Sequence, residues 1–421
     1  MCMPPERTIF LVDGQSFYAS CEKAAHPAYR NRPVAVGDPS RPSGIVLAAC
    51  PIAKARGVTT AERNFTALAK CPDLVIIRPR MQRYIEISLM ITRIFESYTD
   101  LVEPYSIDEQ FLDVTGVLGQ YASAEAMAKQ IQNEILLSTG VWSRVGIGPS
   151  KILAKTATDN FAKKSDEGIF RLGYDNIETV LWPLPIHQMF MVASKMATHF
   201  AIMGLPTIGD IARTPLPEFK RRMRLRMGKQ SDIQAEYYWQ TACGIDPSPV
   251  TPSIRNELKS VSHGKTLRAS LYSKRPDIEL VLQELVIEVC RRARRLGKQG
   301  RVVSVGAGET DGERAYRFGR QITLQHHTNL THEVNAAALR LFREHWHGLP
   351  VAYLHLSLTQ LSDDNVTQLT LFDDRARIHD LEAATDMIKD RYGSAAIMRA
   401  SSLQEAGVAR ERAGQIGGHY K

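Results

Sequence analysis

The order of strand-like and helix-like segments in the amino-terminal third of the chain most limits the fold. An apolar run that ends at Asp13-Gly14 is typical of a buried strand. The expected elements, in chain order, are strand 7–12, helix 82–98, strand 101–106, strand 110–114, helix 123–138 and strand 143–148. With residues 13–79 set aside as an insertion, this is the β-α-β-β-α-β order of a ferredoxin-like α+β fold.

Three carboxylates occupy special places in that order. Asp108 and Glu109 stand between the second and third strands, and Asp13 ends the first. Each acid alone is explained by a polar turn or a helix cap. Because the first and third strands are neighbours in this topology, however, the three should meet at one sheet edge, where unpaired carboxylates are costly unless cations neutralise them.

Three clustered carboxylates favour a pair of hard divalent cations. Oxygen ligands suit two Mg²⁺ ions, with Mn²⁺ as the alternative, and no His or Cys lies in these motifs to favour zinc. Two such ions about 3.5–4 Å apart support phosphoryl chemistry. The expected reaction is therefore nucleotidyl transfer, with the nearby lysines (Lys54, Lys151, Lys155, Lys163 and Lys164) as candidates to hold a triphosphate or as solvated surface groups.

The rest of the chain is expected to form separate domains. Residues 173–244 look helical, 245–257 form a linker, and strands alternate with two helices over 258–375. The segment 376–421 should be one helix followed by a flexible Gly-rich tail. Within helix 82–98, the spacing of Ile85, Leu89, Thr92 and Phe95 predicts the buried stripe.

The net charge of +8 at pH 7 indicates an anionic partner. Two basic runs, at 220–229 and 291–301, are suited to binding DNA phosphates, although such runs are also common on solvated helix faces. The arginines concerned are Arg221, Arg222, Arg291, Arg292, Arg294 and Arg295. Six scattered cysteines without a CxxC pair, no signal-peptide pattern and no long apolar stretch predict a cytoplasmic protein with no membrane partner.

The motifs around the acids resemble those of Y-family translesion DNA polymerases, and within that family the UmuC/MucB/ImpB group. The resemblance rests on Val12-Asp13-Gly14-Gln15-Ser16-Phe17-Tyr18, Ser106-Ile107-Asp108-Glu109 and Gly146-Ile147-Gly148-Pro149-Ser150-Lys151. It implies a right-hand polymerase: a palm (1–12 and 80–172), inserted fingers (13–79), a thumb (173–244) and an α/β little finger (258–375). It also implies template-directed, low-fidelity synthesis across damaged DNA from deoxynucleoside triphosphates on a primer-template, in the SOS response.

The resemblance implies roles for those residues of this sequence that match the motifs of the family. Asp13, Asp108 and Glu109 would bind the catalytic metals, and the carbonyl of Gly14 would complete one shell. Tyr18 matches the aromatic gate against a ribose 2′-OH, with Phe17 beside it as a core or nucleotide contact. Lys54 and Lys163 match the triphosphate-binding cations.

Three positions depart from the family pattern. Gln110 follows the acidic pair where a small residue is usual, and Pro51 stands where some relatives have an aromatic residue. Met191-Val192-Ala193-Ser194 replaces a glycine-containing hairpin that lets backbone amides approach a phosphate.

A peptide near the carboxyl end, Gln368-Leu369-Thr370-Leu371-Phe372, resembles the motif that binds the bacterial sliding clamp. Its alternation also fits a plain edge strand. Beside a template-directed polymerase, three alternatives stay open: a polymerase subunit that is inactive without accessory SOS partners and, less favoured, a nucleotidyl cyclase on a similar palm or a DNA-binding protein without activity. The intact acids argue against the last, because bare carboxylates would repel phosphate.

Overall fold

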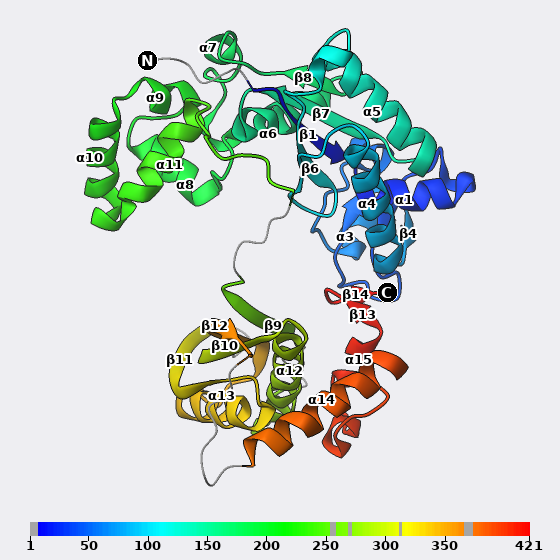
Figure 1. Cartoon of the computed structure of the whole chain (residues 1–421), viewed down its shortest axis with the longest axis vertical. Helices are drawn as coiled ribbons and strands as arrows, with labels where there is room; N and C mark the ends of the chain where they lie inside the picture. The colour runs from blue at the N-terminus through cyan, green and yellow to red at the C-terminus, as the bar shows by residue number, and fades with distance from the viewer. Residues whose placement is uncertain (1–6, 253–257, 268–271, 311–313, 366–373) are drawn as a thin grey trace. The chain divides into compact units, whose positions relative to one another are not determined.

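The computed structural model describes residues 7–252, 258–267, 272–310, 314–365 and 374–421. The chain divides into two compact units, residues 1–254 and 255–421. Each unit is built on its own sheets, and Figure 1 labels most of the elements described below. No helix in the described ranges is both long and apolar enough to cross a membrane.

The first unit is organised around a sheet of strand order β5-β6-β1-β7-β8. Its strands are β1 (Ile9–Gly14), β5 (Val102–Pro104), β6 (Glu109–Asp113), β7 (Ser143–Gly148) and β8 (Ile169–Arg171). With α4 (Met81–Glu96) and α5 (Ala124–Thr139), the first four strands form the predicted β-α-β-β-α-β arrangement, with β1 between β6 and β7. The short strand β8, parallel to β7, was not predicted.

Helix α6 (Lys151–Asn160) lies directly against this sheet. The side chain of Ser150 accepts a hydrogen bond from the amide of Leu153 and so caps its first turn. A Cβ at Gly146 on β7 would stand 2.2 Å from the carbonyl oxygen of Ala154, so only glycine permits this approach. Thr158 Oγ1 also donates to the carbonyl of Leu11 on β1, at 3.1 Å. The end of α6 is thereby held beside the end of β1.

The prediction of which face of α4 is buried is wrong, because the buried face is rotated about the helix axis from the predicted one. The buried side chains are Tyr84, Ile87, Ile91 and Ile94 together with Phe95, whereas Leu89 is 55% exposed. Apolar residues lie on two neighbouring faces of this helix, and both satisfy helical spacing. Tyr84 lies on the face that is buried, and it contacts residues outside the helix.

The insertion after β1 forms a small sheet of order β3-β2-β4 covered by short helices. Its elements are α1 (Phe17–Ala25), β2 (Val34–Val36), β3 (Ala48–Ala49), α2 (Pro51–Ala55), α3 (Asn64–Lys70) and β4 (Val75–Ile77). The predicted helical segment then follows β8. It consists of α7 (Ile177–Val180), α8 (Ser194–Ile202), α9 (Ile208–Arg213), α10 (Leu216–Met227) and α11 (Asp232–Ala242).

The second unit repeats the β-α-β-β-α-β order, as the alternation predicted. Its sheet has the order β11-β10-β12-β9, with two long helices packed on it. The elements are β9 (Ser260–Thr266), α12 (Arg275–Arg295), β10 (Lys298–Thr310), β11 (Ala315–Thr328), α13 (Thr331–His345) and β12 (Val351–Asp363). Strand β9 is therefore an edge strand.

The carboxyl end is ordered where a flexible tail was predicted. Beyond α14 (Arg375–Tyr392) come α15 (Ala409–Ala413), β13 (Gln415–Ile416) and β14 (His419–Tyr420). Val408 is 4% exposed in the apolar core, and its amide donates to Glu284 at 2.8 Å. Gly417 and Gly418 both have positive φ, of 59° and 86°. Two such glycines form a tight hairpin turn between β13 and β14, so the glycines that suggested disorder make a turn instead.

Candidate active site

The strand register brings the predicted acids together. Asp13 and Glu109 are direct partners on the antiparallel strands β1 and β6. Asp108 immediately precedes β6, and its carbonyl accepts a hydrogen bond from the amide of Gly14 at 2.8 Å. The predicted position of the three acids at one sheet edge is therefore confirmed.

A fourth acid lies in the same place. Among the described residues, Asp13, Glu109 and Asp159 offer oxygens that all lie within 4.8 Å of one another. Asp159 sits on α6 and was not singled out in the sequence. Asp108 stands slightly apart, with its Oδ1 accepting from Ser106 Oγ at 2.6 Å. The signal for Asp159 was its spacing of four residues from Lys155, which places both side chains on one face of α6. Lys163 follows in a separate 3₁₀ turn, Ala162–Lys164.

Two lysines compensate these acids. Lys155 Nζ lies 2.6 Å from Glu109 Oε1 and 3.1 Å from Asp159 Oδ2. Lys163 Nζ lies 2.8 Å from Asp13 Oδ2 and 2.7 Å from Asp159 Oδ1. Asp159 therefore joins both ammonium groups to the cluster.

The charge of Asp13 remains costly despite Lys163. Asp13 is only 5% exposed. Burial raises its pKa to about 7, with Lys163 opposing the shift and Glu109 adding to it. Burial disfavours the charge of Lys163, yet its carboxylate neighbours raise its pKa overall. A buried carboxylate is stabilised in its charged form when another cation binds it. Because all the candidate ligands here are oxygens, Mg²⁺ is the ion that fits them. The residues present therefore fit a divalent metal site.

The acids open onto a cavity of about 560 Å³. This cavity is lined by every residue to which a catalytic or nucleotide role was transferred, namely Asp13, Gly14, Phe17, Tyr18, Lys54, Asp108, Glu109 and Lys163. Pro51 also lines it, but Lys151 instead pairs with Glu103 at 3.0 Å.

The ring of Tyr18 packs against a buried tyrosine of α4. Its ring stacks on that of Tyr84, with centroids 4.6 Å apart and planes inclined by 21°. Tyr84 is fully buried, and its hydroxyl donates to Glu22 Oε1 at 2.7 Å. Arg80 holds both oxygens of that buried carboxylate, at 3.0 and 2.8 Å. Phe17, 3% exposed, packs into the core as well as lining the cavity.

The departure at Gln110 also has a structural explanation. Gln110 is 2% exposed, and its amide donates to Thr92 Oγ1 on α4 at 2.8 Å. The side chain therefore ties β6 to α4 and leaves the neighbouring acids free to face the cavity.

Comparison with known proteins agrees with this geometry. The profile of the impB/mucB/samB family matches residues 12–159, and that of its C-terminal domain matches residues 258–371. DNA polymerase IV 2 of Bacillus subtilis (strain 168) is 50% identical over 420 residues, covering 100% of both chains. The chain belongs to the impB/mucB/samB family of Y-family DNA polymerases.

Two further relatives support the assignment. DNA polymerase IV 2 of Halalkalibacterium halodurans is 46% identical over 99% of this chain and 100% of its own. A solved Y-family DNA polymerase chimera of Dbh and Dpo4 superposes with a TM-score of 0.68, covering 84% of this chain and 98% of its own. At 22% identity this likeness concerns the fold, and it bears out the predicted multidomain α+β architecture.

The arginines of the two basic runs pair with different partners: those of α10 with an acid on the same helix, and two of those of α12 with acids on α14. On α10, Arg221 and Arg222 are at the surface and pair with Glu218, at 2.7 and 2.9 Å. On α12, two arginines turn towards α14: Arg291 lies 2.5 Å from Asp390, and Arg294 pairs with Glu382 and Asp386.

Arg291 and Arg294 thus have partners within the carboxyl-terminal unit that the sequence analysis did not predict. Their side chains are only 13% and 8% exposed, and they attach α14 to its own unit. Arg292 pairs with Glu288 on the same helix, at 2.7 Å. The predicted clamp-binding peptide, Gln368 to Phe372, lies outside the described residues.

Proposed function

We propose that this Y-family polymerase adds deoxynucleotides to a primer end opposite damaged template bases, with Asp13, Asp108 and Glu109 holding two Mg²⁺ ions. The observation that carries the proposal is the register pairing of Asp13 with Glu109 at the mouth of the 560 Å³ cavity. A cyclase would have no use for the second unit. A protein that only binds DNA would gain nothing from clustered buried acids.

The bound ions would activate the primer hydroxyl and steady the charge that develops on the transferred phosphoryl group. The protein's own residues hold them: the carboxylates of Asp13, Asp108 and Glu109, with the carbonyl of Gly14. Lys155 and Lys163 offset the mutual repulsion of these acids through the contacts given above. We assign Asp159 the role of positioning these two lysines, because it pairs with both.

The incoming nucleotide would be bound by residues of the same cavity. Tyr18 would lie under the sugar and exclude a ribose 2′-OH, with Phe17 filling the space beside it. Lys163 is already bound to Asp13, so Lys54 is the first cation available to the triphosphate.

The remaining partners follow from charge and from the family. Arg221 and Arg222 of α10, with Arg292 and Arg295 of α12, are the arginines that we retain as contacts to primer-template phosphates. Such contacts give affinity without sequence preference and weaken with salt. The peptide from Gln368 to Phe372 would bind the sliding clamp, accessory SOS proteins would assist, and the polymerase would act beside the nucleoid in the cytoplasm.

Primer extension by purified full-length protein tests the assignment of the acids. Replacing Asp13, Asp108 or Glu109 by the corresponding amide should lower the rate on the order of 10³-fold, because several kcal/mol of charge stabilisation are lost. Asp113→Asn is the matched control: it lies at the other end of β6, where its carboxylate accepts a hydrogen bond from Thr115.

DNA affinity, measured by fluorescence anisotropy, should change little in all these variants. Asp159→Asn should reduce the rate much less than the other three, since it acts through the lysines. A large loss in Asp159→Asn together with an active Asp108→Asn would transfer the metal-binding role to Asp159. Full activity in all four amide variants would refute the polymerase site.

A further inference from the structure

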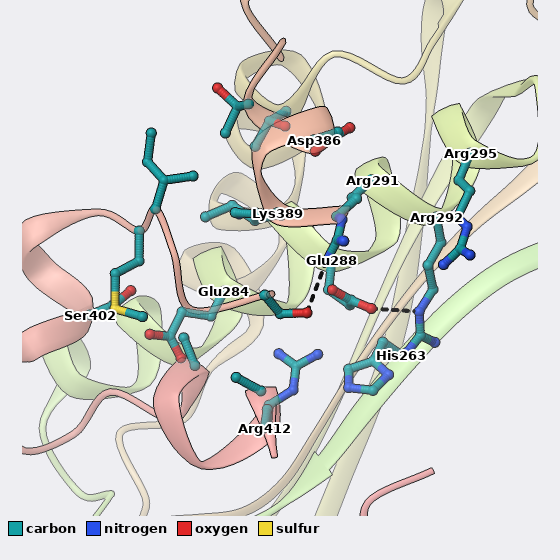
Figure 2. A pocket seen from close by; sticks show the side chains of 18 of the residues that line it. His263, Glu284, Glu288, Arg291, Arg292, Arg295, Asp386, Lys389, Ser402 and Arg412 are labelled. Carbon is teal, nitrogen blue, oxygen red and sulfur yellow. Dashed lines mark hydrogen bonds and ion pairs between the residues drawn. The ribbon is translucent and has the colours of Figure 1, made fainter. Parts of the chain in front are cut away.

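A second and larger cavity lies wholly within the carboxyl-terminal unit. Its volume is about 870 Å³, and it is enclosed by β9, α12, α14 and the segment from 394 to the end of the chain. Figure 2 shows the side chains of Arg412, His263 and Arg292, from α15, β9 and α12, directed towards this hollow. None of these walls belongs to the unit that holds the candidate active site.

The charge in this cavity is incompletely balanced. Arg412 makes no ion pair within 4.0 Å among the described residues, although Glu288 and Glu284 are close enough to favour its charge. Burial nevertheless lowers the pKa of Arg412. Burial together with the cations Arg412, Arg292 and Lys265 also lowers the pKa of His263 to about 3. The hollow is therefore electropositive, and a neutral imidazole faces it.

One wall of the cavity is an unpaired strand edge. Among the described residues, β9 pairs only with β12, and its residues Ser262 to Lys265 line the cavity. The edge of a strand presents backbone N–H and C=O groups that can bind another extended chain.

A buried acceptor points to the same kind of occupant. Glu284 is 4% exposed and lines the cavity. Its Oε2 accepts the backbone amide of Val408, at 2.8 Å, while its Oε1 has no hydrogen-bond partner within the described part of the chain. A second backbone N–H would satisfy it, as a peptide could provide and a phosphodiester could not.

Part of the remaining lining is apolar. Leu381, Ile397 and Met398 form an apolar side, and no Phe, Tyr or Trp lines the cavity to stack a nucleobase. A single-stranded nucleic acid is therefore less well matched than a peptide that alternates acidic and aliphatic side chains.

We propose that this cavity binds an extended acidic peptide of a partner protein. The peptide adds to the free edge of β9, its carboxylates meet Arg412, and its aliphatic side chains meet Ile397 and Met398. Alternation along the peptide sends the two kinds of side chain to opposite sides. Guanidinium groups suit carboxylates because they bind both oxygens at once.

Fluorescence anisotropy with the full-length protein tests this proposal. The probe is a fluorescein-labelled decapeptide of alternating Glu and Leu, and the control peptide alternates Lys and Leu. The acidic peptide should bind, and Arg412→Gln should weaken it by about tenfold, the effect expected for one charge-assisted contact. Arg410→Gln, two residues away on the exposed side of α15, should leave binding unchanged.

Hydrogen exchange on the unaltered protein provides a measurement that does not depend on the stability of any variant. Bound peptide should protect amides within β9, Ser260–Thr266. Absence of acidic-peptide binding, binding that ignores Arg412→Gln, or an unprotected β9 would each overturn the proposal. Labelled oligothymidine that binds with the same dependence on Arg412 would instead make the cavity a nucleic-acid site.

Discussion

Removing the ring of Tyr84 should impair sugar selection by Tyr18, and removing only its hydroxyl should not. The two rings are stacked at 4.6 Å, so Tyr84 forms the surface on which the proposed gate rests. The hydroxyl of Tyr84 contacts Glu22, on the side away from the cavity. Tyr84→Phe keeps the stacked ring, whereas Tyr84→Ala deletes it.

The expected magnitudes separate stability from selection. Tyr84 is fully buried, so Tyr84→Ala should destabilise the first unit by about 3–5 kcal/mol. Tyr84→Phe should cost about 1.5–3 kcal/mol, since one hydrogen bond to a carboxylate is lost while Arg80 still holds Glu22. A stacked aromatic pair contributes about 0.5–1.5 kcal/mol beyond burial, so discrimination against ribonucleotides should fall by roughly twofold to tenfold in Tyr84→Ala alone.

Single-nucleotide primer extension with matched ribo- and deoxynucleoside triphosphates measures this ratio, and urea unfolding measures the stability. Tyr98→Ala is the matched control, because Tyr98 is also buried, at 9% exposure, and donates to a glutamate, Glu134, at 2.6 Å. It should destabilise the protein without altering sugar selection. Equal loss of selection in Tyr84→Phe and Tyr84→Ala, or in Tyr98→Ala, would refute the role of the stack.

Three further outcomes follow from other parts of the chain. Replacing Leu371 and Phe372 by alanine should abolish stimulation of primer extension by the sliding clamp and preserve basal extension; loss of both would favour an edge strand. Arg294→Ala should destabilise the carboxyl-terminal unit by about 3–5 kcal/mol and expose α14 to limited proteolysis, because two acids lose their buried partner, whereas the exposed Arg340→Ala should do little. The lowered pKa of His263 means that the unfolded chain binds more protons between about pH 6.5 and 3, so stability should fall as the pH is lowered through that window, and less steeply in His263→Gln.

The sequence predicted that the acids meet because strand order determines which strands are neighbours. Once β1 and β6 are adjacent and antiparallel, Asp13 at the end of β1 and Glu109 at the start of β6 lie at the same edge of the sheet. Asp159 escaped notice because it lies on a helix, whose distance from β1 depends on how closely α6 packs. That distance is set by Gly146, and one glycine in a motif does not reveal a contact with a particular turn.

Errors arose where local patterns admit two solutions. On α4, the stripe through Leu89 and the stripe through Ile87 obey the same spacing, and the structure buries the second. At the end of the chain, Gly417-Gly418 fits either a disordered tail or a tight turn. The structure has the turn, with β13 paired to β14. The chain before it is fixed by the buried Val408, whose bond to Glu284 joins segments distant in the sequence.

The basic run on α12 shows what a charge pattern can and cannot predict. Arg291 and Arg294 lie on one helical face, and their partners Glu382, Asp386 and Asp390 recur every four residues on α14. That complementary spacing was a signal for helix pairing, but nothing local distinguishes it from a phosphate-binding surface. Because α14 turns its acids inward, its apolar side chains face out: Leu381 is 68% exposed and borders the cavity beside Arg412. The pairing of α12 with α14 therefore leaves an apolar rim beside Arg412, which has no ion pair among the described residues, and an acidic peptide with aliphatic side chains would bind that combination.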